Sequence, residues 1–208
     1  MSRLAVLGAS GHGKVIADIA EQTGWKLVDF FDDAWPGLRH NSHWKVVGGS
    51  SELISSLNQY DGVFVAIGNN SIRLKKLIEL EQANAHIVSL IHPSAIVSTY
   101  SHMGKGSVVM PGAIINVDAS VGDGCIINTG ASVDHDCELG RGVHLSPGVR
   151  LSGSVRVSDG AWLGIGSCVR QSTFIGANAV VGAGAVVVND VEENVTVTGN
   201  PAKIFIRK

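Results

Sequence analysis

Residues 115–144 read INVDAS VGDGCI INTGAS VDHDCE LGRGVH, five consecutive blocks of six residues in which the first residue is always aliphatic. The same spacing continues in both directions without an insertion. The aliphatic positions are Val97, Met103, Val109, Ile115, Val121, Ile127, Val133, Leu139, Leu145, Leu151, Val157, Leu163, Val169, Ile175, Val181 and Val187.

A six-residue repeat is typical of a parallel β-helix, because each short strand forms one side of a coil and neighbouring coils bury one another. The aliphatic column is expected to fill the interior. A second column, four residues after the first, is never large or charged, so the backbone can turn inside it. This column is Ser101, Ser107, Ala113, Ala119, Cys125, Ala131, Cys137, Val143, Val149, Val155, Ala161, Ser167, Thr173, Ala179, Ala185 and Val191.

The hexad is absent before Ile91, where strand-like and helix-like patterns alternate. Alternation of this kind implies a small parallel sheet, with its ligand outside the carboxyl ends of the strands. We therefore predict a Rossmann-like domain over residues 1–91 and a β-helix over residues 92–208. The predicted strands are 4–7, 27–31, 63–67 and 87–90, and the predicted helices carry apolar residues at Val15, Ile16, Ile19 and Ala20, and at Ile72, Leu74, Leu77, Ile78 and Leu80.

Several interpretations are open for the glycine run Gly8–Gly13, GASGHG. A dinucleotide fingerprint needs GxGxxG, which this run lacks, although Asp32 stands where a ribose-binding acid would. A triphosphate loop fits GxxxxGK but places Val15 where a magnesium-binding hydroxyl is required. A third interpretation is an anion site for a sugar nucleotide diphosphate, built from backbone amides and a helix N-terminus with Ser10 and His12 as extra donors. A turn that only packs is the remaining alternative.

Composition excludes several classes of function. A net charge of −2 over 208 residues gives no case for binding nucleic acid or an anionic membrane surface. The N-terminus lacks the apolar core of a signal peptide and no stretch approaches transmembrane length, so a cytoplasmic location is expected. Of three cysteines, Cys125 and Cys137 fall in the small column and are expected to be reduced.

The hexads resemble those of the hexapeptide-repeat acyltransferases. That resemblance implies a left-handed β-helix of triangular cross-section, with three hexads to a coil and about five coils here. The strings GASGHGK, FFDD and AIGNNSIRLKK resemble the sialic acid acetyltransferase and bacillosamine-type family, and this likeness runs through both domains. Those enzymes acetylate sugars, mostly amino sugars carried on a nucleotide.

In that family the N-terminal domain holds the nucleotide. Arg73 lies one helical turn beyond Asn69 and could reach the same site, or could be an exposed cation on the helix. The residues that the resemblance implicates in binding the sugar nucleotide are Ser10, His12, Asp32, Asp33, Gly68, Asn69 and Arg73.

His135 is the candidate general base. Val133 and Cys137 belong to the interior columns, so the His135 side chain between them points outward. A flanking carboxylate can fix the imidazole tautomer and stabilise its charged form. The segment NTGASVDHDC also resembles the active-site segment of the family, which makes Asp136 the orienting partner and leaves Asp134 as a residue that could simply be solvated.

One coil of three hexads places Gly153 over His135, about 4.8 Å away. A glycine there leaves room for a thioester and exposes a backbone amide to a developing oxyanion. Asn128 and His144 also point outward. The resemblance puts Asn128 near the sugar and His144 near the coenzyme, although either could be an ordinary surface group.

The ending Thr198–Lys203, TGNPAK, matches the G-x-P-A-K ending common in these acyltransferases. Pro201 cannot donate to a strand ladder, so the segment suits a turn that ends the last coil. The resemblance places it beside coenzyme A, where Gly182, Ala183 and Gly184 would line the groove. Lys203 would meet a phosphate of the coenzyme or stay a surface lysine.

A zinc site is not expected. Some hexapeptide β-helices bind zinc through three histidines, but the coils here offer only His102, His135 and His144, and His102 lies nearly two coils before His135 on another side. The outward Cys168 lies nearly two coils beyond His135, so an acyl-enzyme is not expected either. The expected mechanism is therefore direct transfer of the acyl group to the acceptor, with no metal and no acyl-enzyme.

The sequence therefore predicts an acetyl-CoA-dependent N-acetyltransferase that acts on the 4-amino group of a UDP- or GDP-linked amino-deoxysugar. The resemblance implies a homotrimer with its sites between subunits. Two alternatives stay open, namely O-acetylation of a sialic acid or related sugar, and a non-catalytic scaffold that binds sugar nucleotides.

Overall fold

The computed structural model describes residues 2–206 and divides the chain into two compact units, Met1–Pro93 and Ser94–Lys208. The boundary placed from sequence, between residues 91 and 92, lies close to this division. Each unit is described by itself. No helix among residues 2–206 is long and apolar enough to cross a bilayer.

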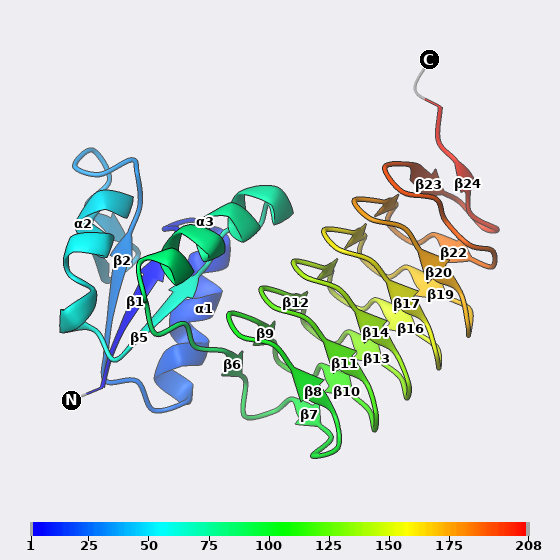
Figure 1. The fold of residues 1–208 in the computed structure, drawn as a ribbon, viewed down its shortest axis with the longest axis horizontal. Coiled ribbons are helices and arrows are strands. Elements are labelled where there is room, and N and C mark those ends of the chain that lie inside the picture. The colour runs from blue at the N-terminus through cyan, green and yellow to red at the C-terminus, as the bar shows by residue number, and fades with distance from the viewer. Residues whose placement is uncertain (1, 207–208) are drawn as a thin grey trace. The chain divides into compact units, whose positions relative to one another are not determined.

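The N-terminal unit is a small α/β sheet of strand order β3-β4-β2-β1-β5, around which the helices pack (Figure 1). The β1–β2, β1–β5 and β2–β4 pairs are parallel, and β3–β4 is antiparallel. The elements are β1 (Arg3–Leu7), α1 (Gly11–Gln22), β2 (Leu27–Phe31), β3 (His40–Asn41), β4 (Trp44–Gly48), α2 (Ser50–Ser55), the 3-10 turn η1 (Leu57–Gln59), β5 (Gly62–Val65), α3 (Asn70–Gln82) and β6 (Leu90–Ile91).

Two features of this unit differ from the sequence-based expectation. The strand expected at 87–90 is reduced to a bridge between Ile87 and Val63, followed by the short β6, while β4 and α2 were not foreseen. In α3, Ile72 and Ile78 are exposed although they were expected to pack, and Arg73 is buried. The buried face of α3 carries Leu77 and Leu80. Arg73 lies on the same face, because main-chain carbonyl oxygens accept hydrogen bonds from its guanidinium.

The glycine run packs tightly where β1 passes into α1. Gly8 has a φ of 111°, and a Cβ there would lie 2.8 Å from the carbonyl oxygen of Ala66. A Cβ on Gly13 would lie 2.3 Å from the carbonyl oxygen of Gly8. Only residues without a side chain allow this close approach of turn, helix and neighbouring loop.

The C-terminal unit is a parallel β-helix built of three ladders of very short strands. The first sheet contains β7 (Ile96–Val97), β10 (Ile114–Ile115), β13 (Ser132–Val133), β16 (Arg150–Leu151), β19 (Cys168–Val169) and β22 (Val186–Val187). The second contains β8 (His102–Met103), β11 (Ser120–Val121), β14 (Glu138–Leu139), β17 (Arg156–Val157) and β20 (Phe174–Ile175). The third contains, within this unit, β9 (Val108–Val109), β12 (Ile126–Ile127), β15 (His144–Leu145), β18 (Trp162–Leu163), β21 (Val180–Val181), β23 (Thr196–Thr198) and the terminal β24 (Lys203–Ile204).

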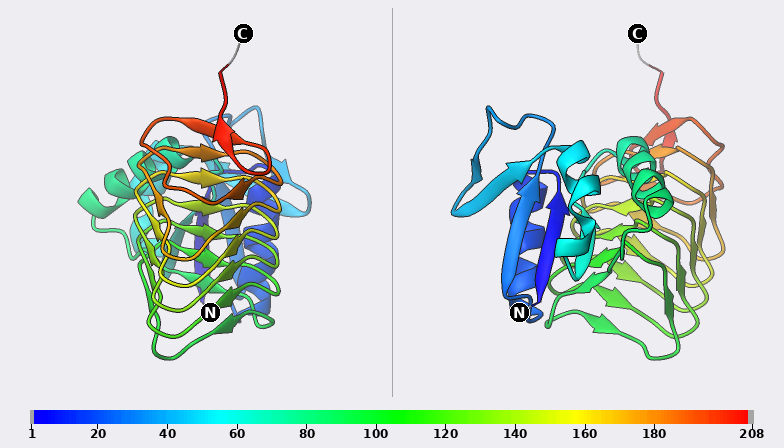
Figure 2. Two further views of the ribbon diagram at one scale, coloured as in Figure 1. Left: turned by 90° about the vertical axis from the view of Figure 1, so that its right-hand side faces the viewer. Right: turned by 60° about the vertical axis from the view of Figure 1, so that its left-hand side comes forward.

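The register confirms the predicted coil of three hexads. Ile115 pairs with Val133, and Val133 with Leu151. Every aliphatic position of the repeat is the second residue of a strand, and those from Val109 onward are buried in one continuous core with most of the small column. Figures 1 and 2 show the coils stacked on one another. Cys125 and Cys137 are free thiols inside that core, as expected.

Most corners of the coils have one residue in the left-handed backbone region. Two of the corners use mainly glycine, with φ between 64° and 71°. The corner between the first and second sheets uses Asp118, Asp136, Ser154 and Ser172 instead, with φ of 56° to 58°. This corner therefore keeps a polar side chain at a position that glycine would otherwise occupy, and it is the corner that carries His135.

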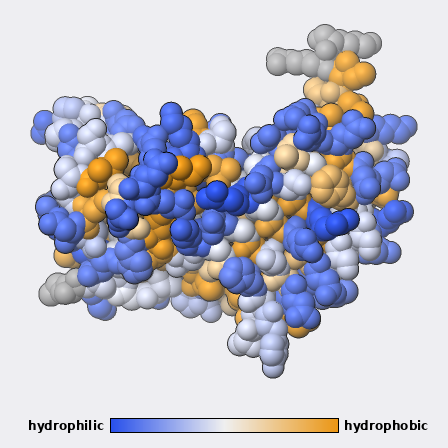
Figure 3. Space-filling model, viewed as in Figure 1, coloured by the Kyte–Doolittle hydropathy of each residue, from blue (hydrophilic) through white to orange (hydrophobic). Residues whose placement is uncertain are grey.

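The repeat ends after β22. Val181 pairs with Val197, slightly less than a full coil later, and β23 turns back into the antiparallel β24 (Lys203–Ile204) through the segment that contains Pro201. Ile204, Phe205 and Ile206 are exposed. Figure 3 shows orange, hydrophobic surface near the C-terminal end of this unit. An antiparallel hairpin cannot continue the parallel ladder, so β24 ends the stack.

Candidate active site

His135 and Asp136 form a hydrogen-bonded pair at the corner between the first and second sheets. Nδ1 of His135 lies 2.7 Å from Oδ2 of Asp136, and both side chains are more than half exposed. A carboxylate only accepts, so Nδ1 carries the proton and Nε2 presents its lone pair. Among residues 2–206, Nε2 has no hydrogen-bond partner. The carboxylate raises the pKa of His135 above its ordinary value of 6.5.

Asp134 supports this pair from the other side. Its Oδ1 accepts the backbone N–H of His135 at 2.8 Å and the side-chain amide of Asn116 at 2.9 Å. These bonds lower the pKa of Asp134. Asp134 is therefore not merely solvated, because it fixes the backbone from which the imidazole projects. Asn116 was not foreseen, but it lies one coil before Asp134, so counting along the repeat would have found it.

Gly153 stacks over His135 as the coil count predicted. The N–H of Ser154 donates to the carbonyl oxygen of His135 at 2.9 Å, and a Cβ built on Gly153 would touch the imidazole. The amide N–H of Gly153 donates no hydrogen bond to any of the described residues. The imidazole of His135 and an unpaired backbone donor thus stand next to each other.

Asn128 and His144 lie together on the third sheet rather than beside His135. Nδ2 of Asn128 is 3.3 Å from Nε2 of His144. The His144 ring stacks on Trp162, with centroids 6.0 Å apart and planes inclined by 19°. Nε1 of Trp162 donates to Oγ of Ser146 at 2.8 Å. Trp162 was missed, although it stands one coil after His144. Within one chain, this cluster and His135 face outward from different sides of the prism.

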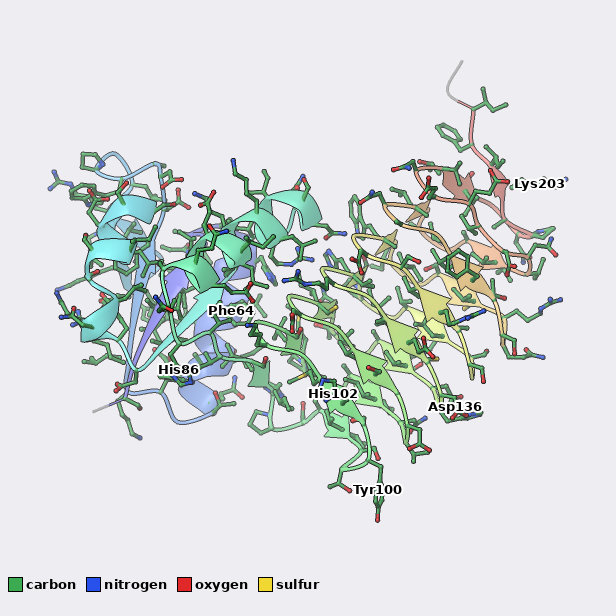
Figure 4. The ribbon with its side chains drawn as sticks, viewed as in Figure 1. Phe64, His86, Tyr100, His102, Asp136 and Lys203 are labelled. Atoms are coloured by element: carbon green, nitrogen blue, oxygen red, sulfur yellow. The ribbon has the colours of Figure 1, made fainter. Side chains whose placement is uncertain are left out.

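The residues expected at the coenzyme lie further along the stack. Gly182, Ala183 and Gly184 form the corner between the third and first sheets, and Lys203 lies in β24. Figure 4 shows Asp136 at the outer edge of the β-helix and Lys203 at its C-terminal end. From β13 to β22 the first sheet advances by three strands, roughly 14 Å. A single chain therefore places His135 and the residues Gly182–Gly184 on different corners.

The outer face of the second sheet is an open groove of about 960 Å³. It begins at Asp118 and Asp136 and passes Glu138, Arg156 and Phe174. The groove is mainly polar, and Asp136, the partner of His135, stands at its edge.

The N-terminal unit has a smaller pocket of about 260 Å³ at the carboxyl ends of its strands. Four of the residues predicted to bind the nucleotide line it, namely Ser10, Asp32, Asp33 and Gly68. Ser50 and Lys76 also line it and were not foreseen. Nζ of Lys76 donates to Oγ of Ser50 at 3.0 Å and lies 3.7 Å from Oδ2 of Asp33.

The neighbouring carboxylates of Asp32 and Asp33 have different hydrogen-bond partners. Oδ2 of Asp32 accepts the N–H of Ala9 at 2.8 Å and Oδ1 accepts that of Ala34 at 3.0 Å, so Asp32 holds the glycine turn. Asp33 accepts the N–H of Ser50, which lowers its pKa. The Asp33 side chain is 64% exposed and remains accessible from the pocket.

Asn69 and Arg73 hold the loop that carries Gly68. Asn69 caps α3 by accepting the N–H of Ile72 at 3.1 Å. Arg73 is 1% exposed, and its Nη1 donates to the carbonyl oxygens of Ile67 and Gly68 at 2.9 and 3.0 Å. The alternative of an exposed helix cation is therefore wrong, and a contact of Arg73 with the sugar nucleotide stays a prediction.

His12 is a half-buried histidine at the start of α1. Its Nε2 is inaccessible to solvent and has no hydrogen-bond partner among residues 2–206. Burial and the nearby Arg73 guanidinium lower the pKa of His12 to about 4. His12 is thus a neutral imidazole with one polar atom left unpaired, which is costly unless a ligand uses it.

No group of three or more histidine, cysteine or acidic side chains that could hold a metal ion occurs within residues 2–206. Cys168 is an exposed thiol in β19 of the first sheet, one coil beyond β16.

Two family descriptions match the chain. Residues 3–80 match the PglD N-terminal domain, and residues 118–153 match the bacterial transferase hexapeptide of six repeats. Together with the three ladders, they define the class of protein, a left-handed β-helix acetyltransferase with an N-terminal Rossmann-like domain.

Similar proteins identify the family within this class. The acetyltransferase domain of PglB from Neisseria gonorrhoeae FA1090, solved with acetyl coenzyme A, is 42% identical, with a TM-score of 0.93 over 98% of each chain. PerB from Caulobacter crescentus, solved with CoA and GDP-perosamine, is 39% identical, with a TM-score of 0.94 over 99% of this chain and 98% of that one. This chain belongs to their family of acetyltransferases.

A curated relative is the UDP-N-acetylbacillosamine N-acetyltransferase of Bacillus subtilis (strain 168). It is 39% identical over 113 residues, which are 52% of this chain and 51% of that protein. The match therefore spans about half the length of this relative.

Proposed function

We propose that this protein transfers the acetyl group of acetyl-CoA to the 4-amino group of an amino-deoxysugar linked to UDP or GDP. The observation that carries the proposal is the exposed His135, with Nδ1 bound to Asp136 and Nε2 open, against the unpaired amide of Gly153. The family relatives named for bacillosamine and perosamine support an amino sugar as the acceptor.

The geometry suits direct transfer. The sugar amine attacks the thioester carbonyl carbon while Nε2 of His135 takes a proton from the nitrogen. Asp136 stabilises the imidazolium that forms, and the N–H of Gly153 stabilises the oxyanion. Collapse of the tetrahedral intermediate breaks the C–S bond, and the imidazolium returns its proton to the departing thiolate. The products are the N-acetyl sugar and free coenzyme A.

The N-terminal unit would hold the nucleotide. Its pocket combines the glycine turn and the N-terminus of α1, which favour a diphosphate, with Asp33, Ser50 and Lys76, which can form hydrogen bonds to a ligand. The unpaired Nε2 of His12 offers a further hydrogen-bonding atom, a donor or an acceptor according to the tautomer of the ring. Sequence resemblance and the pocket thus favour the same unit as the sugar-nucleotide site.

Two copies of the chain would complete each reaction site. His135 stands at one corner of the β-helix, whereas Gly182–Gly184 and the Asn128–His144 cluster lie on others. These groups face different directions in one chain. They would come together if the corner that carries His135 in one copy packed against the other corner of a neighbouring copy. A homotrimer provides this arrangement three times by symmetry.

The proposal is tested by following thiol release from acetyl-CoA with UDP- and GDP-linked 4-amino-deoxysugars as acceptors, and with CMP-sialic acid and free sialic acid alongside. We expect turnover with at least one nucleotide-linked amine and with neither sialic acid. Turnover only with a sialic acid would establish O-acetylation instead. No thiol release with any acceptor, from a protein that binds sugar nucleotides in calorimetry, would indicate a scaffold.

A further inference from the structure

The turn that carries Asn128 fixes which way its side-chain amide points. Its Oδ1 accepts the backbone N–H of Thr129 at 2.8 Å, and its Nδ2 lies 3.3 Å from Nε2 of His144. A backbone N–H can only donate, so the atom that faces Thr129 must be the amide oxygen. The NH₂ group therefore faces His144.

This orientation decides where His144 carries its proton. An amide NH₂ group only donates, so the hydrogen bond forms only if Nε2 of His144 is the acceptor and bears no proton. The ring proton of the neutral imidazole then sits on Nδ1. His144 is held as the Nδ1–H tautomer by a neighbour that occupies its basic nitrogen.

Trp162 holds the plane of the same ring. β15 and β18 are adjacent strands, and their register places Trp162 directly opposite His144. The two rings are nearly parallel, and the indole is itself anchored through Nε1 to Oγ of Ser146. A flat, hydrogen-bonded indole is a rigid platform for a second ring.

His135 and His144 therefore differ in which ring nitrogen is unprotonated and in whether that nitrogen is open. In His135, Asp136 binds Nδ1 and leaves Nε2 open, while in His144 the amide of Asn128 occupies Nε2. We propose that His144 acts in acetyl transfer only as a neutral Nδ1–H hydrogen-bond donor and exchanges no proton with the substrates. Asn128 and Trp162 are then positioning residues that hold its tautomer and its plane. The donor role rests on the proposed function, whereas the tautomer does not.

The tautomer can be measured directly on the full-length protein. Long-range ¹H–¹⁵N spectra of protein labelled at its histidine rings give the protonation state of each ring nitrogen, and the signals missing from a His144→Gln variant identify His144. We expect the shift of a bare nitrogen at Nε2 and of a protonated nitrogen at Nδ1. A proton on Nε2 in the wild-type protein would overturn the proposal.

Asn128→Asp is the sharpest variant, because it keeps the shape and the oxygen that faces Thr129 but replaces the donor with an acceptor. The carboxylate should draw a proton onto Nε2 and lower kcat/KM about two- to tenfold, the scale of one hydrogen bond. Asn178→Asp is the matched control, since Nδ2 of Asn178 also makes a side-chain bond of 3.3 Å, to Asn194, in another coil. It should leave both the spectrum and kcat/KM unchanged. An unaltered His144 spectrum in Asn128→Asp would also overturn the proposal.

The two readouts separate this proposal from the function on which it rests. If His144 shows the Nδ1–H tautomer and no amino sugar is acetylated, the proposed function fails while the tautomer stands. If an amino sugar is acetylated and His144 carries its proton on Nε2, the proposed function stands and this inference fails.

Discussion

The imidazole of His135 rests against the backbone of Gly153, so closely that a Cβ on residue 153 would lie 2.5 Å from Cε1 and 2.6 Å from Nε2 of the ring. Both distances are far inside van der Waals contact. The sequence alone predicts that this glycine makes room for a thioester. The structure shows that the first group displaced by a side chain here is the imidazole itself.

Gly153→Ala should therefore lower kcat by about a hundredfold or more, the scale for losing a general base, and change the dissociation constant of acetyl-CoA little. Steady-state kinetics and calorimetry measure the two quantities. Because the variant acts through His135, adding it to His135→Asn should cause almost no further loss. A Gly153→Ala enzyme with normal kcat would show that the register or the base is misassigned.

Leu151 lies close to Gly153 along the chain but faces the interior and is 2% exposed. Leu151→Ala should lower the free energy of unfolding by about 2–5 kcal/mol through the cavity it leaves. Leu151→Met, which keeps the volume, should cost less than about 1.5 kcal/mol. Urea unfolding followed by circular dichroism compares the two, and equal stabilities would contradict the assignment of this rung to the core.

The pH profile should report the Asp136–His135 pair. Only neutral His135 can accept a proton, and Asp136 raises the pKa of His135, so the acidic limb of kcat/KM should lie above pH 6.5. Asp136→Asn removes the stabilisation of the charged ring and should move that limb to lower pH while reducing kcat. Asparagine also tolerates the left-handed backbone of residue 136, so the change is chemical.

The amine of the substrate titrates as well, but its pKa is the same for both enzymes. The difference between the two profiles therefore isolates His135. An acidic limb that stays in place, or moves to higher pH, would show that Asp136 does not act on the base.

The N-terminal unit can be tested through His12 and Asp32. His12→Ala should raise KM for the sugar nucleotide about tenfold, on the scale of one buried hydrogen bond, and leave KM for acetyl-CoA unchanged. Asp32→Ala should raise the same KM and also lower the melting temperature, because both of its carboxylate oxygens hold main-chain N–H groups. Micromolar binding of NAD or ATP in calorimetry would contradict a sugar-nucleotide site.

The β-helix could be predicted almost residue by residue because each of its coils packs only on the coils before and after it in the sequence. Each rung packs on the rungs one coil before and after it, so a count along the chain gives both the core and the neighbour of His135. The same count would have paired His144 with Trp162, but the direction of the Asn128 amide depends on a hydrogen bond of its own turn, which no count supplies.

The N-terminal unit has no sequence repeat from which neighbours can be counted. The predictions that were wrong for this unit follow from that. The segment Trp44–Gly48 forms a strand because β2 and β3 pair with it, although it carries little pattern of its own. Arg73 is buried because three oxygens of its own loop and helix accept from it. Both outcomes depend on partners that become neighbours only in the folded unit.

Everything that positions His135 comes from residues 116–154, which span three adjacent turns of the stack. Each turn contacts only the turns before and after it. A whole additional turn of three hexads placed beyond this segment would lengthen the protein and leave the distances around the base unaltered. A single residue added between Val133 and Gly153 would instead slide every later strand out of step and bring a different residue over the imidazole. The position of His135 and of its neighbours on the β-helix is thus set by the number of residues that separate them along the chain.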